Sequence, residues 1–144
     1  MLYELEVLEA RHIADLAQDA CSARDRVLKR IRATNVQEPR AARGAHTAGA
    51  RAVFDAAMAA LPEQVALRHA IASLPRDIQE KLWATALVGR GEGAISGWNE
   101  SLRSAGQLSD EALAADLVDD PNLHDCLRKG LYVLGDATIP GDDR

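Results

Sequence analysis

Aromatic side chains are scarce in this chain of 144 residues, where they make up 3% of the sequence. They are Tyr3, Phe54, Trp83, Trp98 and Tyr132. So few rings argue against an extended platform on which bases or sugars could stack. Alanine and leucine carry most of the apolar share of 47%, and they favour closely packed helices over a sheet rich in aromatic and β-branched residues.

Cysteines and long apolar runs are also in short supply. The two cysteines, Cys21 and Cys126, are too few for a disulfide framework and lack the spacing of a metal site. No stretch approaches the roughly 20 apolar residues that a membrane-spanning helix needs, so we expect no contact with a membrane. The first residues lack a basic start followed by an apolar run, so we expect no signal peptide. These absences predict a cytoplasmic protein.

Helical periodicity is present instead, and no alternating strand pattern of useful length competes with it. Residues 1–33 hold neither glycine nor proline and predict one long helix. At about 100° per residue, its apolar side chains share one stripe, with Glu9 among them. The stripe consists of Leu2, Leu5, Ile13, Leu16, Ala20, Ala23, Val27 and Ile31. Residues 34–47, which include Pro39 and Gly44, predict a loop.

Turn and cap signals divide the rest of the chain into shorter helices. Helices are expected over residues 48–60, 62–73 and 75–88, and after the amino-terminal caps Ser96, Ser109 and Asp120. Gly89 is the expected carboxyl-terminal cap of the helix at 75–88, and Gly135 the expected end of the last helix.

The sequence therefore predicts an all-α protein, a compact bundle of six or seven helices with a long N-terminal helix. Residues 1–135 are expected to form a single domain, with the helical core at 48–135. Residues 136–144 are expected to form a disordered tail.

Two segments carry a resemblance to a known family. The first contains Asp77, Leu82, Gly89, Arg90, Gly91, Glu92 and Trp98, and the second contains Pro121, Leu123, Asp125, Leu127, Gly130, Leu131, Leu134 and Gly135. Over residues 74–135 these motifs resemble the bacterial family known as domain of unknown function 3775. Gly93 departs from the family, which often has an aromatic residue there. The resemblance implies a helical domain and no established activity, so the motif residues have no assigned role.

Three short patterns suggest chemistry, and each has a simpler structural explanation. Glu9 and His12 have the spacing of di-iron bundles, but the other histidines lack a glutamate three residues before them, and a local contact between Glu9 and His12 is the simpler interpretation. The glycines around Arg90 follow a helix end, where exposed carbonyls disfavour a phosphate. Arg90 is then better explained as a cap or as an ion-pair partner of Glu92 or Glu100.

The third pattern is His124-Asp125-Cys126, which has the residue types of a cysteine–histidine catalytic pair. Consecutive helical positions diverge by about 100°, so these side chains cannot converge on one substrate atom. Cys126 is most simply a small core residue, and Asp120 with His124 a pair that steadies the helix start. We therefore expect no catalytic residue, no metal site and no cofactor.

Charge is unevenly spread along the chain, whose net charge is −5. Residues 24–51 hold eight basic residues against two acidic ones, and residues 92–144 hold four against eleven. The two parts can face each other within or between subunits, or the basic part can bind an anionic partner. The candidate contacts for such a partner are Arg24, Arg26, Lys29, Arg30, Arg32, Arg40 and Arg43. The negative total charge and the lack of aromatic or amide readers argue against nucleic acid.

The leading hypothesis is a small cytoplasmic bacterial protein that binds another protein or itself and is not an enzyme. The apolar stripe of residues 1–33 is too long for so small a bundle to cover, which predicts a homodimer through the N-terminal helix. The alternative is a binder of nucleic acid or a nucleotide through residues 24–51.

Overall fold

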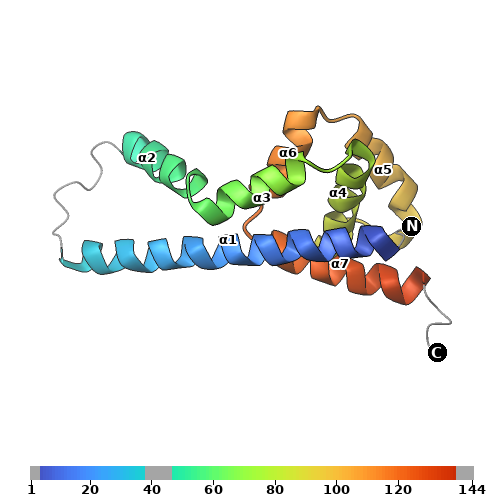
Figure 1. Cartoon of the computed structure of the whole chain (residues 1–144), viewed down its shortest axis with the longest axis horizontal. Coiled ribbons are helices and arrows are strands. Elements are labelled where there is room, and N and C mark those ends of the chain that lie inside the picture. Colours follow the sequence, from blue (N-terminus) through green and yellow to red (C-terminus); the bar gives the residue numbers. More distant parts are fainter. Residues whose placement is uncertain (1–3, 38–46, 139–144) are drawn as a thin grey trace.

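The structure is a computed structural model that describes residues 4–37 and 47–138 of the chain. These residues form seven α-helices and one short 3-10 helix, with no strand among them (Figure 1). The elements are α1 (Glu4–Gln37), α2 (Thr47–Ala59), α3 (Pro62–Ala72), α4 (Arg76–Arg90), η2 (Ile95–Gly97), α5 (Trp98–Gly106), α6 (Asp110–Val118) and α7 (Leu123–Thr138). The predictions of an all-α fold and of a long N-terminal helix are confirmed.

Helices α4 and α7 form the most extensive helix pair, and α1 packs against both α7 and α3. In Figure 1, α1 runs along the length of the molecule, with α7 beside its N-terminal half and α3 along its other side. Helix α6 packs against α3 and α4, while α5 packs against α4. The bundle is thus built around α4 and α7.

The contact face of α1 is lined by alanines rather than leucines. The buried side chains of its N-terminal half are Ala10, Ile13, Ala14, Ala17 and Ala20. Alanine lets a neighbouring helix approach closely. The buried face of α1 is therefore centred on Ala10 and Ala14, and Leu16 lies at its edge. Glu9 is exposed, so its predicted place in the apolar stripe is wrong.

Two predicted helix ends are wrong because the helices continue past them. Helix α1 extends to Gln37, so residues 34–37 belong to it rather than to a loop, and residues 38–46 lie outside the described part of the chain. Helix α7 continues past Gly135 to Thr138, which contradicts the disorder expected there. Residues 139–144 lie outside the described residues.

The helix starts were predicted more closely than the ends. Ser109 caps α6 as expected, since its Oγ accepts a hydrogen bond of 3.0 Å from the backbone N–H of Ala112. Ser96 lies within η2 instead of capping α5, whose N-cap position is taken by Gly97. Asp120 precedes a turn, and its Oδ1 accepts a hydrogen bond of 2.9 Å from the N–H of Asn122 before α7 begins.

Part of the molecule lies outside the main bundle. We use "arm" for residues 24–37 of α1 together with α2. The two buried apolar clusters include no residue of the arm. Figure 1 shows the two segments of the arm diverging at the end of the molecule away from α4 and α7. None of the helices in the described residues is long and apolar enough to cross a membrane.

Candidate functional site

The crossing of α4 and α7 is a close contact that depends on two glycines. A Cβ atom on Gly89 would lie 1.8 Å from the carbonyl oxygen of Cys126. A Cβ on Gly130 would lie 2.1 Å from the carbonyl oxygen of Thr85. Since no side chain fits at either position, the backbones of the two helices are in direct contact.

The carboxyl-terminal cap of α4 is Gly91 rather than the expected Gly89. Gly91 has a φ of 84°, a left-handed conformation that glycine adopts without strain. The backbone N–H groups of Glu92 and Gly93 then reach back to the carbonyl of Leu87, at 3.0 and 3.1 Å. Gly89 cannot take this role, because it lies inside the helix at the crossing with α7.

Arg90 links the end of α4 to the start of α7. Its Nε and Nη2 donate hydrogen bonds of 3.2 and 2.9 Å to Oδ2 of Asp120. Its Nη1 lies 3.8 Å from Oε1 of Glu92, so the expected pairing with Glu92 is confirmed as the longer of two ion pairs. Burial lowers the pKa of Arg90, but the hydrogen bond and charge of Asp120 more than offset that effect and raise it. The guanidinium is therefore occupied by carboxylates of its own chain.

His124 and Cys126 show no arrangement suited to nucleophilic catalysis. Burial is the main cause that raises the pKa of the Cys126 thiol, which keeps it protonated at neutral pH. The Nδ1 atom of His124 is buried and has no hydrogen-bond partner in the described part of the chain. Cys126 belongs to the core, as expected. Asp120 contacts Arg90 and Asn122, whereas we expected it to pair with His124.

The remaining motif residues also make contacts of a structural kind. Trp98 is buried in the second apolar cluster together with residues of α4 and α7. Asp125 forms an ion pair of 3.0 Å with Lys129 on the exposed surface of α7, and Pro121 is exposed in the turn before that helix. The motifs thus describe how α4 and α7 fit together, and a ligand site has to be sought elsewhere.

The residues expected to contact an anion lie on the arm or outside the described residues. Arg26, Lys29 and Arg32 are exposed on α1, as is Arg30, while Arg24 is half-buried. Arg26 reaches Glu63 of α3 at 3.5 Å. Arg40 and Arg43 fall in the segment 38–46, which the structure does not describe.

The residues with the spacing of a metal site do not come together at one point. Glu9 and His12 are both exposed on α1, and no hydrogen bond joins them in the described structure. Among the described residues, no group of three His, Cys, Asp or Glu side chains is placed to hold a metal ion.

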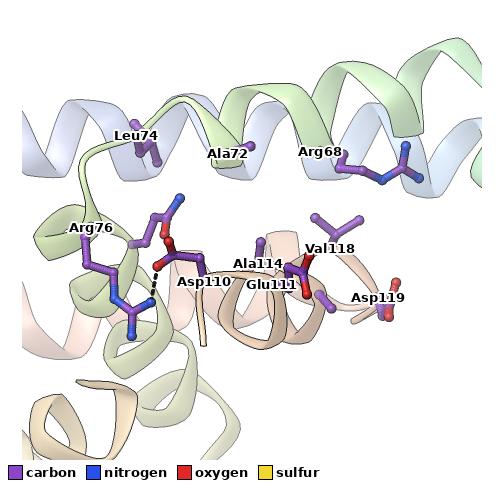
Figure 2. Close-up of a pocket in the computed structure, with 11 residues that line it drawn as sticks. Arg68, Ala72, Leu74, Arg76, Asp110, Glu111, Ala114, Val118 and Asp119 are labelled. Atoms are coloured by element: carbon purple, nitrogen blue, oxygen red, sulfur yellow. Dashed lines mark hydrogen bonds and ion pairs between the residues drawn. The ribbon is translucent and has the colours of Figure 1, made fainter. Parts of the chain in front are cut away.

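A cleft of about 500 Å³ lies between α3, the start of α4 and α6 (Figure 2). Its apolar lining consists of Ala72, Leu74, Ala114, Ala115 and Val118, and its polar lining of Arg68, Arg76, Gln79, Asp110, Glu111 and Asp119. An apolar surface with a few polar groups around it is typical of binding sites for small molecules. This cleft is the candidate functional site.

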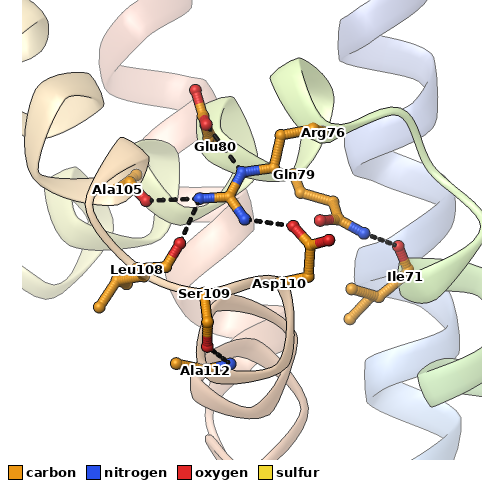
Figure 3. A network of polar contacts seen from close by, with 9 residues as sticks. All are labelled: Ile71, Arg76, Gln79, Glu80, Ala105, Leu108, Ser109, Asp110 and Ala112. Carbon is orange, nitrogen blue, oxygen red and sulfur yellow. Dashed lines mark hydrogen bonds and ion pairs between the residues drawn. The ribbon is translucent and has the colours of Figure 1, made fainter.

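The wall of the cleft is fixed by Arg76, whose guanidinium joins three helices (Figure 3). Its Nε donates to Glu80 at 2.8 Å, and its Nη1 donates to Asp110 at 2.5 Å. Its Nη2 donates to the carbonyls of Ala105 and Leu108, at 3.0 and 2.6 Å. The hydrogen bond to Glu80 is the largest cause that raises the pKa of Arg76, and Asp110 adds to it. Four of the five N–H donors of the guanidinium are thus bound by its own chain.

The amide groups near the cleft are fixed in the same manner. Nε2 of Gln79 donates a hydrogen bond of 2.7 Å to the carbonyl of Ile71 at the end of α3. Nε2 of Gln64 donates one of 3.2 Å to the carbonyl of Val118 at the end of α6. Both glutamines are buried, and both use their donors to close a helix end.

Sequence reasoning missed this cleft entirely. Arg76, Gln79 and Asp110 lie near helix starts, where charged and amide residues are common, so the sequence does not mark them as residues of a cleft. The one local signal was the spacing of Glu111 and Asp119, which flank apolar residues on one face of α6. That signal becomes informative only once α3 is known to lie opposite this face.

Comparisons with known proteins agree with the motifs. The family model described as "Protein of unknown function (DUF3775)" matches residues 64–135, half of the chain. Neither the curated proteins nor the solved structures contain a match to this chain.

Proposed function

Since this chain belongs to the DUF3775 family of proteins of unknown function, we propose from its geometry that it acts by binding rather than by catalysis. Its partner is another protein, with a second copy of the chain as the specific candidate, and the contact is made through the N-terminal helix. We place this activity in the bacterial cytoplasm, where the two unpaired cysteines stay reduced.

The apolar residues of the arm are the observation that supports this proposal. Val27, Leu28 and Ile31 of α1 are only half-buried, and Phe54 of α2 is half-buried as well. Val53 has an exposed fraction of 71%. These side chains belong to neither core cluster, although apolar residues of this size are usually buried in a folded helical protein. A second arm would cover them.

Self-association also suits the small size of the arm. A two-helix segment that packs little against its own bundle gains stability by burying apolar surface on a partner, at roughly 25 cal/mol per Å². Homo-oligomers with twofold symmetry are the commonest soluble assemblies, since one patch then covers its own copy.

The test is the oligomeric state of the full chain and of two arm variants, Leu28→Asp and Val53→Asp. The unaltered chain is expected to sediment as a dimer in analytical ultracentrifugation. An aspartate at either position would place an unpaired charge in the apolar contact, so each variant is expected to dissociate at least about tenfold more readily.

Tyr132→Asp is the matched control, because Tyr132 is 72% exposed and belongs to α7. Figure 1 shows α7 beside the half of α1 that is away from the arm. This variant is expected to remain dimeric. A monomeric unaltered chain, or dissociation caused by Tyr132→Asp instead of the arm variants, would contradict the proposal.

A second candidate function uses the same arm for an anionic partner, a nucleic acid or a nucleotide. Arg26, Lys29 and Arg32 are exposed within about two turns of α1, where their charges add up. Binding of a short single-stranded DNA should then weaken steeply with salt and should be lost in the Lys29→Ala, Arg32→Ala double variant. An apolar contact between two like-charged arms, by contrast, is strengthened by salt because screening reduces their repulsion.

A further inference from the structure

The cleft between α3, α4 and α6 presents the carboxylates of its lining as hydrogen-bond acceptors, and Arg68 is the lining residue that keeps most of its donors. Four of the five N–H donors of Arg76 and one of the two amide N–H donors of Gln79 are bound to groups of the chain itself. Arg68 donates to the carbonyl of Ala59 at 3.1 Å. The carboxylates of Glu111 and Asp119 have no hydrogen bond or ion pair within the residues that the structure describes.

Gln79 supplies an acceptor of particular interest because its side chain is buried. Its exposed fraction is 6%, and its orientation is set by the hydrogen bond from Nε2 to the carbonyl of Ile71. The amide oxygen must therefore point the other way. Figure 3 shows it directed toward the carboxylate of Asp110, and no donor of the described residues bonds to it. Two acceptors that face each other leave a place for a hydrogen-bond donor between them.

Helix α6 extends this pattern along the cleft. Asp110 and Glu111 lie at its start and Asp119 at its end, with Ala114, Ala115 and Val118 between them. Glu111 and Asp119 are eight residues apart, about 12 Å along a helix that rises 1.5 Å per residue. The side of α6 that lines the cleft thus carries acidic groups at both ends and an apolar middle.

We propose that this cleft binds a linear aliphatic polyamine. Its ammonium groups would meet Gln79 and Asp110 at one end and Asp119 at the other, and its methylene chain would lie on Ala72, Leu74 and Val118. Ammonium groups only donate hydrogen bonds, which matches the carboxylate and amide oxygens that they would meet here. A peptide fits less well, because each of its residues brings a carbonyl oxygen that would need a donor.

The charge balance of the site agrees with a ligand that carries more than one positive charge. The lining residues and Glu80 together hold four carboxylates and two guanidinium groups, a net charge of −2. Arg76 is shared between Glu80 and Asp110, so one negative charge of that group is left over, besides Glu111 and Asp119. Arg68 keeps its positive charge, which is already counted in that balance, and its Nη2 donates to the carbonyl of Ala59.

The experiment is isothermal titration calorimetry of the full chain with spermidine, hexylamine and N-acetyl-lysine methylamide. Spermidine is expected to bind at a single site. Hexylamine has one ammonium group, and the lysine compound adds peptide carbonyls, so both are expected to bind at least about tenfold more weakly.

Two double variants with the same change of charge locate the site. The Glu111→Gln, Asp119→Asn variant changes two exposed side chains, so we expect the fold to stay intact. We expect this variant to bind spermidine about tenfold more weakly. The Glu92→Gln, Glu100→Gln variant changes two acidic residues of a separate, smaller cleft of about 330 Å³ and should bind as the unaltered chain does.

Each other outcome overturns the proposal. Equal losses in the two double variants would mean attraction to negative charge in general rather than a site in this cleft. Tighter binding of the lysine compound than of spermidine would mean that a peptide is the occupant. No heat of binding with spermidine at low salt would mean that the cleft does not take polyamines. None of these results depends on whether the arm forms a dimer.

Discussion

Gly89 and Gly130 have no side chains, and this allows the backbones of α4 and α7 to be in direct contact. In a packed interior even one added methyl group is felt, because its neighbours have no empty space to move into. Here the neighbouring atoms are carbonyl groups of the opposite helix, which are less able to move aside than a flexible side chain. A change at either glycine would therefore force the two helices apart.

The substitution Gly130→Ala is expected to lower the free energy of unfolding by about 2 kcal/mol, measured by chemical denaturation. Alanine favours a helix by up to about 1 kcal/mol over glycine, but overpacking against Thr85 outweighs that gain. Gly135→Ala is the matched control on the same helix, because a Cβ at Gly135 meets no atom within 4 Å. That variant should be as stable as the unaltered chain or slightly more stable. An equal loss at both positions would contradict the close contact at Gly130.

The sequence identified these glycines as motif residues but could not give them roles. A glycine directly after an apolar helix usually acts as its cap, and Gly89 and Gly91 both fit that pattern. Which of the two adopts a left-handed conformation depends on where α7 crosses. Gly89 lies against Cys126, a residue 37 positions further along the chain, and no local pattern contains that contact.

Helix boundaries show how far local chemistry determines a single element. Ser109 was recognised as a cap because a hydroxyl before a run with acids in its first turn satisfies a free backbone N–H. Gly135 was misread as a stop because glycine permits a helix end without requiring one. Gly91 is the glycine with a positive φ in the described part of the chain, and it is there that α4 ends.

At this scale we expect Ser109→Ala to destabilise the protein by about 1 kcal/mol, since the N–H of Ala112 would lose its partner at the start of α6. Thermal unfolding followed by circular dichroism would measure the change. Ser96→Ala is a suitable comparison, because Ser96 lies within η2 and its side chain caps no helix. A similar loss in both variants would show that the cap of α6 adds little.

At the scale of the molecule, the sequence predicted the fold class but not the neighbours of each helix. Periodic leucines and alanines show which face of a helix is buried, and this was enough for the all-α bundle. They do not show that α3 lies across from α6, which is what creates the cleft. For the same reason the sequence predicts a long N-terminal helix but does not predict that one part of it packs in the bundle and the other part belongs to the arm.

The division between bundle and arm predicts uneven stability. Backbone amides of α4 and α7 should exchange with deuterium about a hundredfold more slowly than those of α2, because few buried contacts hold the arm. Hydrogen exchange followed by mass spectrometry at low protein concentration would resolve the two regions. Equal protection of α2 and α7 against exchange would contradict the prediction of uneven stability.

Helix α1 is continuous for 34 residues without a glycine or proline, a length of about 50 Å. Such a helix has no built-in hinge, since kinks arise almost always at those residues or at a local break in the hydrogen-bond ladder. The packing of its N-terminal half in the bundle therefore sets the direction of the far end of α1. Two molecules joined through their arms would hold their bundles at a set distance and a set relative rotation. Both quantities would depend on the number of residues in α1.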